Sequence, residues 1–182
     1  MSIPTALDPA AAIQSAIPDA VQGIEEVGGE TTSIVTPDRI NEVAQYFRDT
    51  PGLIYNFLSD ISGVDYYEQY GGYGDRPERF AVCYHLLSML YKRRLRLKVY
   101  LPEDNPVVDT VIGVWPGADW FERETWDLMG IEFRGHPDKR RLMMPEDWEG
   151  HPLRRDYPLG YETVMFSFNV DEKMKHKPFA KE

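Results

Sequence analysis

The sequence predicts an α+β fold: a small antiparallel sheet with helices packed on one face, followed by a long extended C-terminal segment. Three observations lead to this prediction. The neighbouring segments Arg79–Ser88 and Arg93–Leu101 have strand patterns and are joined by four residues, as in an antiparallel pair. Apolar residues recur at helical spacing after Thr36. Beyond Ile131 this periodicity disappears, and the chain becomes rich in proline and charge.

The first 30 residues are rich in alanine, proline and glycine, and we expect this segment to be partly ordered. A short helix is predicted around Pro9–Ser15. Strands are predicted at Ala20–Glu26 and Thr31–Val35, and the glycine turn at Gly28–Gly29 between them favours a hairpin.

Two longer helices follow from capping and spacing. Thr36 is a suitable N-cap, Pro37 takes the first helical position, and the helix is expected to stop before Pro51. The apolar positions of this helix are Ile40, Val43, Ala44 and Phe47. A second helix is predicted from an Asp119 N-cap, with Glu122 completing a capping box, through Met129 to a stop at Gly130. A fourth helix, a short one, is predicted at Val107–Ile112.

These elements divide the chain into three predicted parts. They are an N-terminal segment (residues 1–30), an α+β core domain (31–135) and an extended C-terminal segment (136–182). Some 50 residues without regular structure are improbable in a free-standing domain. The C-terminal segment is therefore predicted to lie along a partner protein.

Composition excludes several classes of function. Residues 1–75 contain twelve acidic and two basic residues, whereas residues 76–182 contain eighteen of each, so the first part carries the whole net charge of −10. Nucleic-acid binding through a basic face is therefore not expected. The single cysteine, Cys83, excludes an iron–sulfur cluster held by this chain alone. No apolar run reaches the length of a membrane span, and the first twelve residues lack the pattern of a secretory signal.

No set of residues has the spacing typical of catalysis or metal binding. Glu122 and Glu124 fall on different faces of the predicted helix, which disfavours a paired acid and base. His136 and His151 are fifteen positions apart, and each precedes a proline, so hydrogen bonding in an ordered loop is favoured over zinc ligation. A metal-dependent enzyme using these histidines and nearby acids remains the alternative from a different class.

Residues 119–159 combine tryptophan, arginine and methionine with paired charges, which is typical of a surface covered by another protein. We predict a subunit interface here and no catalytic, cofactor-binding or metal-binding residue. The predicted interface residues are Trp120, Glu122, Arg123, Glu124, Trp126, Asp127, His136, Arg140, Arg141, Trp148, His151, Arg154, Arg155 and Asp156.

The same region resembles a known family. Residues 122–143, E-R-E-T-W-D-L-M-G-I-E-F-R-G-H-P-D-K-R-R-L-M, are similar to the signature of the thirty-kilodalton subunit of respiratory NADH dehydrogenase. This is the C subunit family of type-1 NADH–quinone oxidoreductase, complex I. The following M-P-E-D-W-E-G-H-P-L-R-R-D-Y-P resembles the family's usual continuation, and the similarity extends over about residues 35–160.

This resemblance implies a non-catalytic subunit in the peripheral arm of a proton-translocating complex. The implied partners are other peripheral-arm subunits, chiefly the large subunit that helps form the quinone site. FMN and iron–sulfur clusters are expected in partner subunits and none in this chain. The implied location is the cytoplasmic face of the inner (plasma) membrane, with membrane contact only through the complex. Related subunits occur in membrane-bound hydrogenases and in ferredoxin-linked or plastid-type dehydrogenases, so the electron donor stays open.

Overall fold

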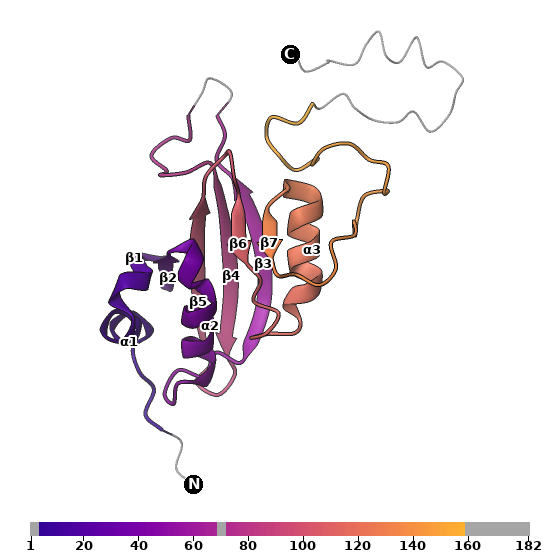
Figure 1. Cartoon of the computed structure of the whole chain (residues 1–182). Coiled ribbons are helices and arrows are strands. Elements are labelled where there is room, and N and C mark those ends of the chain that lie inside the picture. The colour runs from indigo at the N-terminus through magenta and orange to yellow at the C-terminus, as the bar shows by residue number, and fades with distance from the viewer. Residues whose placement is uncertain (1–3, 69–71, 159–182) are drawn as a thin grey trace, which may run out of the picture.

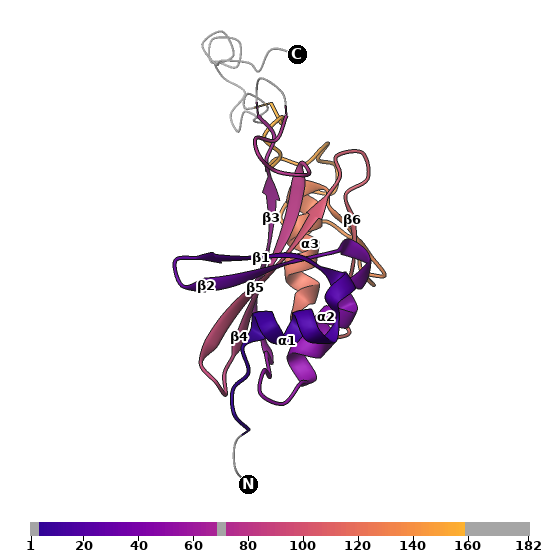
Figure 2. The ribbon, with the colours of Figure 1, turned by 90° about the vertical axis from the view of Figure 1, so that its left-hand side faces the viewer.

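The computed structural model describes residues 4–68 and 72–158, and these form an α+β fold in which helices cover one face of a five-stranded sheet (Figure 1). The strands are β1 (Val21–Val27), β2 (Glu30–Val35), β3 (Phe57–Asp65), β4 (Phe80–Ser88) and β5 (Arg93–Leu101). The helices are α1 (Pro9–Ala16), α2 (Ile40–Asp49) and α3 (Ala118–Met129). Figure 2 shows all three helices on the same side of the sheet.

The sheet is mixed, with the strand order β1-β2-β5-β4-β3. The β1–β2, β4–β5 and β3–β4 pairs are antiparallel, whereas β2 and β5 run parallel. The prediction of an α+β fold is confirmed, but the expectation of a purely antiparallel sheet is wrong at the β2–β5 pair. That pairing joins segments more than 60 residues apart, and no local sequence pattern specifies its direction.

The core lies between the sheet and the helices. Leu95, Leu97, Val99 and Leu101 of β5 all point to this side and are buried, as their alternation predicts. The hairpin register brings Phe80, Val82, Tyr84 and Leu86 of β4 to the same face.

Helix α2 forms where the sequence predicts it, but it begins differently. Its apolar positions, Ile40, Val43, Ala44 and Phe47, are each fully buried. Thr36 and Pro37 do not start the α-helix, since a 3₁₀ turn at Pro37–Arg39 comes first and the Thr36 side chain makes no capping hydrogen bond. At the N-terminus, α1 matches the predicted helix, and Asp8 caps it by accepting a hydrogen bond from Ala11.

Three further features of the structure, strand β3, the segment Val107–Asp109 and the start of α3, differ from what the sequence predicts. Strand β3 was not predicted, and the predicted helix at Val107–Ile112 is wrong. Val107–Asp109 is instead strand β6, which pairs in parallel with β7 (Glu132–Arg134). The prediction of an Asp119 N-cap is also wrong: α3 begins at Ala118 with Gly117 as N-cap, and buried Glu122 accepts hydrogen bonds from Thr110 and Val111 instead of completing a capping box. The predicted C-terminal stop is confirmed by Gly130, which adopts φ 70°.

No helix within residues 4–68 and 72–158 combines the length and the apolar character needed to cross a membrane.

Candidate subunit interface

Helix α3 lies against the edge strand β3, and a glycine allows the close approach. A Cβ atom on Gly63 would lie 3.1 Å from side-chain carbons of both Thr125 and Met129. Both of these residues are buried, and Thr125 donates a hydrogen bond to the Ile61 carbonyl. This contact positions α3 and, with it, the chain that follows.

The carboxylate of Asp127 holds the segment that folds back along α3. Asp127 is fully buried, and its Oδ2 accepts hydrogen bonds from three successive backbone N–H groups, those of Leu142, Met143 and Met144, at 2.7–2.9 Å. The guanidinium of Arg141 donates to Oδ1 at 2.7 Å. Burial would raise the pKa of Asp127, but these hydrogen bonds outweigh it and lower the pKa below its ordinary value.

The backbone carbonyls at the C-terminal end of α3 accept hydrogen bonds from the same segment. His151 Nδ1 lies 2.9 Å from the Asp127 carbonyl, and the Leu153 N–H donates to the Leu128 carbonyl. Arg154 donates to the carbonyls of Met129 and Gly130. Carbonyls at a helix end have no partner within the helix, and cations there also complement its dipole. Residues 141–154 are therefore built onto this domain as the cap of α3.

A second cluster fixes the beginning of this segment. Arg123 donates to the carbonyls of Arg140 and Arg141, forms an ion pair with Asp138 at 3.3 Å, and lies over the Trp120 ring. Arg140 pairs with the same carboxylate at 2.7 Å but stays largely exposed. The pKa of Asp138 is strongly lowered, first by its hydrogen bonds with Arg140.

Arg79 anchors the far end of the segment to the sheet. Its side chain is only 3% exposed and pairs with Asp65 at 3.0 Å, Glu103 at 2.6 Å and Asp156 at 2.8 Å. The backbone N–H of Arg155 donates to Asp65 as well. Burial would raise the pKa of Asp65, but the hydrogen bonds from Arg79 and from the Arg155 backbone outweigh it and lower the pKa.

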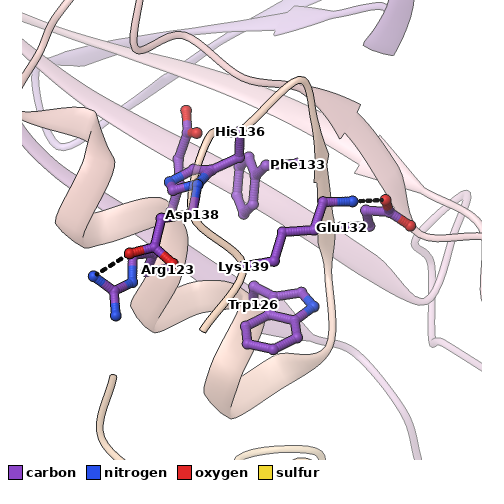
Figure 3. A pocket seen from close by; sticks show the side chains of 8 residues that line it. Arg123, Trp126, Glu132, Phe133, His136, Asp138 and Lys139 are labelled. Carbon is purple, nitrogen blue, oxygen red and sulfur yellow. Dashed lines mark hydrogen bonds and ion pairs between the residues drawn. The ribbon is translucent and has the colours of Figure 1, made fainter. Parts of the chain in front are cut away.

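A small pocket lies between α3 and residues 132–139, with Trp126 and Phe133 among its walls (Figure 3). His136 Nδ1 accepts a hydrogen bond from the Asp138 N–H, so its Nε2–H is free to donate to the Asp119 carbonyl at 3.2 Å. The two carboxylate oxygens of Glu122 accept hydrogen bonds from the Thr110 hydroxyl and the Val111 N–H. Burial raises its pKa to about 7, since these hydrogen bonds only partly offset desolvation.

The polar groups around this pocket therefore serve packing, and no nucleophile with an adjacent base lies among them. Within the part of the chain that the structure describes, three or more His, Cys, Asp or Glu side chains do not gather as a metal site would require.

The predicted interface residues fall into three groups by the solvent exposure of their side chains. Glu122, Asp127 and His136 are buried, and Arg123, Trp126, Arg141, Trp148, His151 and Arg154 are partly buried. Trp120, Glu124, Arg140, Arg155 and Asp156 are exposed, with Trp120 at 59%. Met143 and Leu153 of the same segment, which were not among the predicted residues, have apolar side chains that are each more than half exposed. Arg79 and Asp65, which anchor the segment from below the surface, were also not predicted, because their partners lie too far along the chain for a local pattern to reveal them.

Replacing Gly130 with alanine is expected to loosen the cap of α3. A Cβ at this positive-φ position would lie 2.5 Å from both Arg154 and His151, so both side chains must move. We expect a loss of about 1–3 kcal/mol of unfolding free energy. Urea denaturation measures this loss, with Gly113→Ala as control because a Cβ there meets nothing within 4 Å. Equal effects of the two changes would contradict the argument.

The fold and this site define a class of α+β protein in which buried ion pairs hold an extended segment against a helix. Such an arrangement is typical of a subunit of a larger assembly. Residues 33–163 match the model of the family described as respiratory-chain NADH dehydrogenase, 30 Kd subunit. The chain belongs to this family.

Individual relatives agree with this assignment. The chain is 50% identical over 170 residues to the C subunit of NADH-quinone oxidoreductase from Roseiflexus sp. (strain RS-1), covering 93% of this chain and 94% of the relative. The corresponding protein of Roseiflexus castenholzii is 51% identical over 172 residues, covering 94% and 95%.

Two solved structures have a similar fold. A trypsin-resistant fragment of Nqo5 aligns with a TM-score of 0.60 at 36% identity, covering 71% of this chain and 97% of the fragment. A chain of the archaeal membrane-bound sulfane sulfur reductase aligns with a TM-score of 0.66 at 20% identity, covering 95% and 94%. The second similarity concerns the fold alone.

Proposed function

We propose that this chain is a non-catalytic peripheral-arm subunit of a proton-translocating NADH–quinone oxidoreductase. The family match over residues 33–163, with relatives of 50% and 51% identity named as the C subunit of that enzyme, carries the proposal. Electrons would pass from NADH through FMN and iron–sulfur clusters, held by partner subunits, to quinone. The subunit would act at the cytoplasmic face of the inner (plasma) membrane and contact the membrane only through the complex.

We further propose that the surface of α3 and residues 140–157 packs beside the large subunit that helps form the quinone site. Trp120, Met143 and Leu153 are 59%, 63% and 58% exposed on this surface. The hydrogen bonds of Asp127 and Arg141 hold the segment in place before assembly, which lowers the entropy cost of binding.

Trp120→Ala is expected to weaken assembly without destabilising the isolated chain. A tryptophan at the centre of an interface contributes about 2 kcal/mol or more, which corresponds to roughly 30-fold in affinity. Because Trp120 is mostly exposed here, the unfolding free energy of the free chain should change by less than about 0.5 kcal/mol. Co-purification and chemical denaturation measure the two effects separately.

Two methionines provide a matched control. Met143 and Met89 are 63% and 61% exposed, but Met89 lies in the β4–β5 turn at the other end of the sheet. Met143→Ala should reduce recovery of the partner subunits, whereas Met89→Ala should not. Equal recovery with both variants would place the interface elsewhere.

A mild-detergent pull-down from native membranes with the chain tagged tests the function as a whole. Recovery of flavin- and cluster-bearing subunits together with NADH–quinone activity supports the proposal. Recovery of hydrogenase or ferredoxin-linked partners would instead favour the related enzymes that share this kind of subunit. A chain that is recovered alone and loaded with metal would exclude the assembly role.

A further inference from the structure

The face of the sheet turned away from the helices carries a buried cation. Side chains of β4 and β5 alternate between the two faces, and Cys83 and Lys98 lie opposite one another on the face away from the core. In Figure 2 the helices lie on the other side of these strands. Lys98 is nevertheless only 8% exposed.

Two tyrosines surround the ammonium of Lys98. Its Nζ lies 4.9 Å from the centre of the Tyr100 ring and 5.4 Å from that of Tyr66. The two rings are 6.2 Å apart and tilted by 38°. Aromatic faces attract a cation, but they do not neutralise its charge.

Lys98 has no ion pair with a carboxylate of the described residues, although its strand neighbour Arg96 pairs with Glu30 at 3.1 Å. Burying a charge without a counter-charge is costly, so such groups are normally paired. Further positive charge lies nearby. Arg76 sits 5.4 Å from the Tyr66 ring, and Arg94 is exposed on the same side of β5.

Glu30 and Asp60 supply two negative charges beside Arg96 and His85 on this face, so Arg76, Arg94, Arg96 and Lys98 still leave an excess of positive charge, in contrast to the net charge of −10 of the whole chain. It is therefore not a by-product of overall composition. Tyrosine and arginine are also the residues enriched at the centres of protein interfaces, where a cation is desolvated against its partner. A partner carboxylate would supply the counter-charge that Lys98 lacks.

We propose that this face, defined by Tyr66, Arg76, Arg94, Lys98 and Tyr100, is a second contact surface that accepts an acidic segment of a neighbouring subunit, with one carboxylate seated against Lys98. It lies on the opposite side of the sheet from α3. The inference requires that the chain works within a multisubunit complex. It does not depend on which partner protein covers α3.

Zero-length carbodiimide cross-linking of the complex purified from native membranes tests the contact directly, since it joins an amine only to a carboxylate in contact with it. We expect an amide bond between Lys98 and an Asp or Glu of another subunit, identified by mass spectrometry. Lys139 and Glu132, 2.5 Å apart within this chain, provide the internal positive control. In Lys98→Arg the charge remains and the Lys98 product should be lost.

A second variant separates assembly from folding. Lys98→Met keeps an apolar stem over both rings and removes the unpaired ammonium, so the melting temperature of the isolated full chain should stay the same or rise. Association with the rest of the complex should weaken by about 30-fold or more. Lys92→Met, in the exposed β4–β5 turn, should change neither quantity.

Three results would overturn the proposal. One is a Lys98 cross-link to residues 159–182 of this chain or to a second copy of it. Another is the absence of any Lys98 product while the Lys139–Glu132 product forms. The third is a fall in the melting temperature of Lys98→Met that accounts for its loss of association, which would make Lys98 a structural residue only.

Discussion

Asp127→Ala is expected to cost about 3–5 kcal/mol of unfolding free energy, or to release residues 141–151 from α3 altogether. The substitution leaves the Arg141 guanidinium and three backbone N–H groups without their shared acceptor. Unsatisfied buried donors keep the full cost of desolvation. Urea denaturation measures the global loss, and amide hydrogen exchange at Leu142 and Met144 measures the local one.

Glu124→Ala is the matched control, because it removes an acid from the same helix at an exposed position. It should change stability by less than about 0.5 kcal/mol. If Asp127→Ala were as mild as this control, the carboxylate would not hold the segment.

The loss of stability in Asp127→Ala should depend on pH with a defined sign. The pKa of Asp127 is lower in the folded chain than in the unfolded chain. Its contribution is therefore fully present above the unfolded value of about 3.9 and is lost as the pH falls toward the folded value. The stability difference between wild type and Asp127→Ala should accordingly shrink below about pH 4.

Arg79→Met is expected to have an effect of similar size, about 3–5 kcal/mol, because it leaves the Asp65 carboxylate buried without its cation. The Asp65 side chain is only 1% exposed, and Arg79 holds it through two hydrogen bonds of 3.0 and 3.1 Å. Arg79→Lys should also be destabilising, since a lysine cannot reproduce this forked geometry and reach Glu103 and Asp156 together.

Arg39→Met is the control for Arg79. Arg39 pairs with Glu42 on the surface of the protein, with both side chains more than 40% exposed, and such pairs contribute about 0–1 kcal/mol. Thermal unfolding of Arg79→Met, Arg79→Lys and Arg39→Met in parallel compares their losses of stability. A ranking in which Arg39→Met equals Arg79→Met would contradict the role assigned to Arg79.

The parts of the fold that could be predicted are those specified by neighbouring residues. The β4–β5 pair follows from alternation and a short turn, and the apolar positions of α2 follow from helical spacing. The end of α3 follows from Gly130, whose positive φ suits glycine. The parallel β2–β5 and β6–β7 pairings were missed because each depends on contacts between distant segments.

The distinction between local patterns and distant contacts also explains which features of the candidate interface could be predicted. Composition predicts a subunit interface on α3 and the following segment, and that location stays a prediction, whereas the contacts of individual residues could not be predicted. Asp127 resembles any helix-surface acid in the sequence, and only the fold shows that its partners are 14–17 positions further along. Arg79 meets Asp65 before it and Asp156 far after it. The prediction of a separate C-terminal segment from residue 136 onward remains untested as a partner-binding element, although its described part is attached to α3.

The parallel pairing of β2 with β5 also has a consequence for biosynthesis. The β1–β2 hairpin leaves the ribosome well before β5, its neighbour in the sheet among the described strands, which ends at Leu101. A two-stranded hairpin is at best marginally stable alone. Until β5 has been translated, the nascent chain therefore presents an unpaired strand edge, and this is the interval in which chaperone protection matters most.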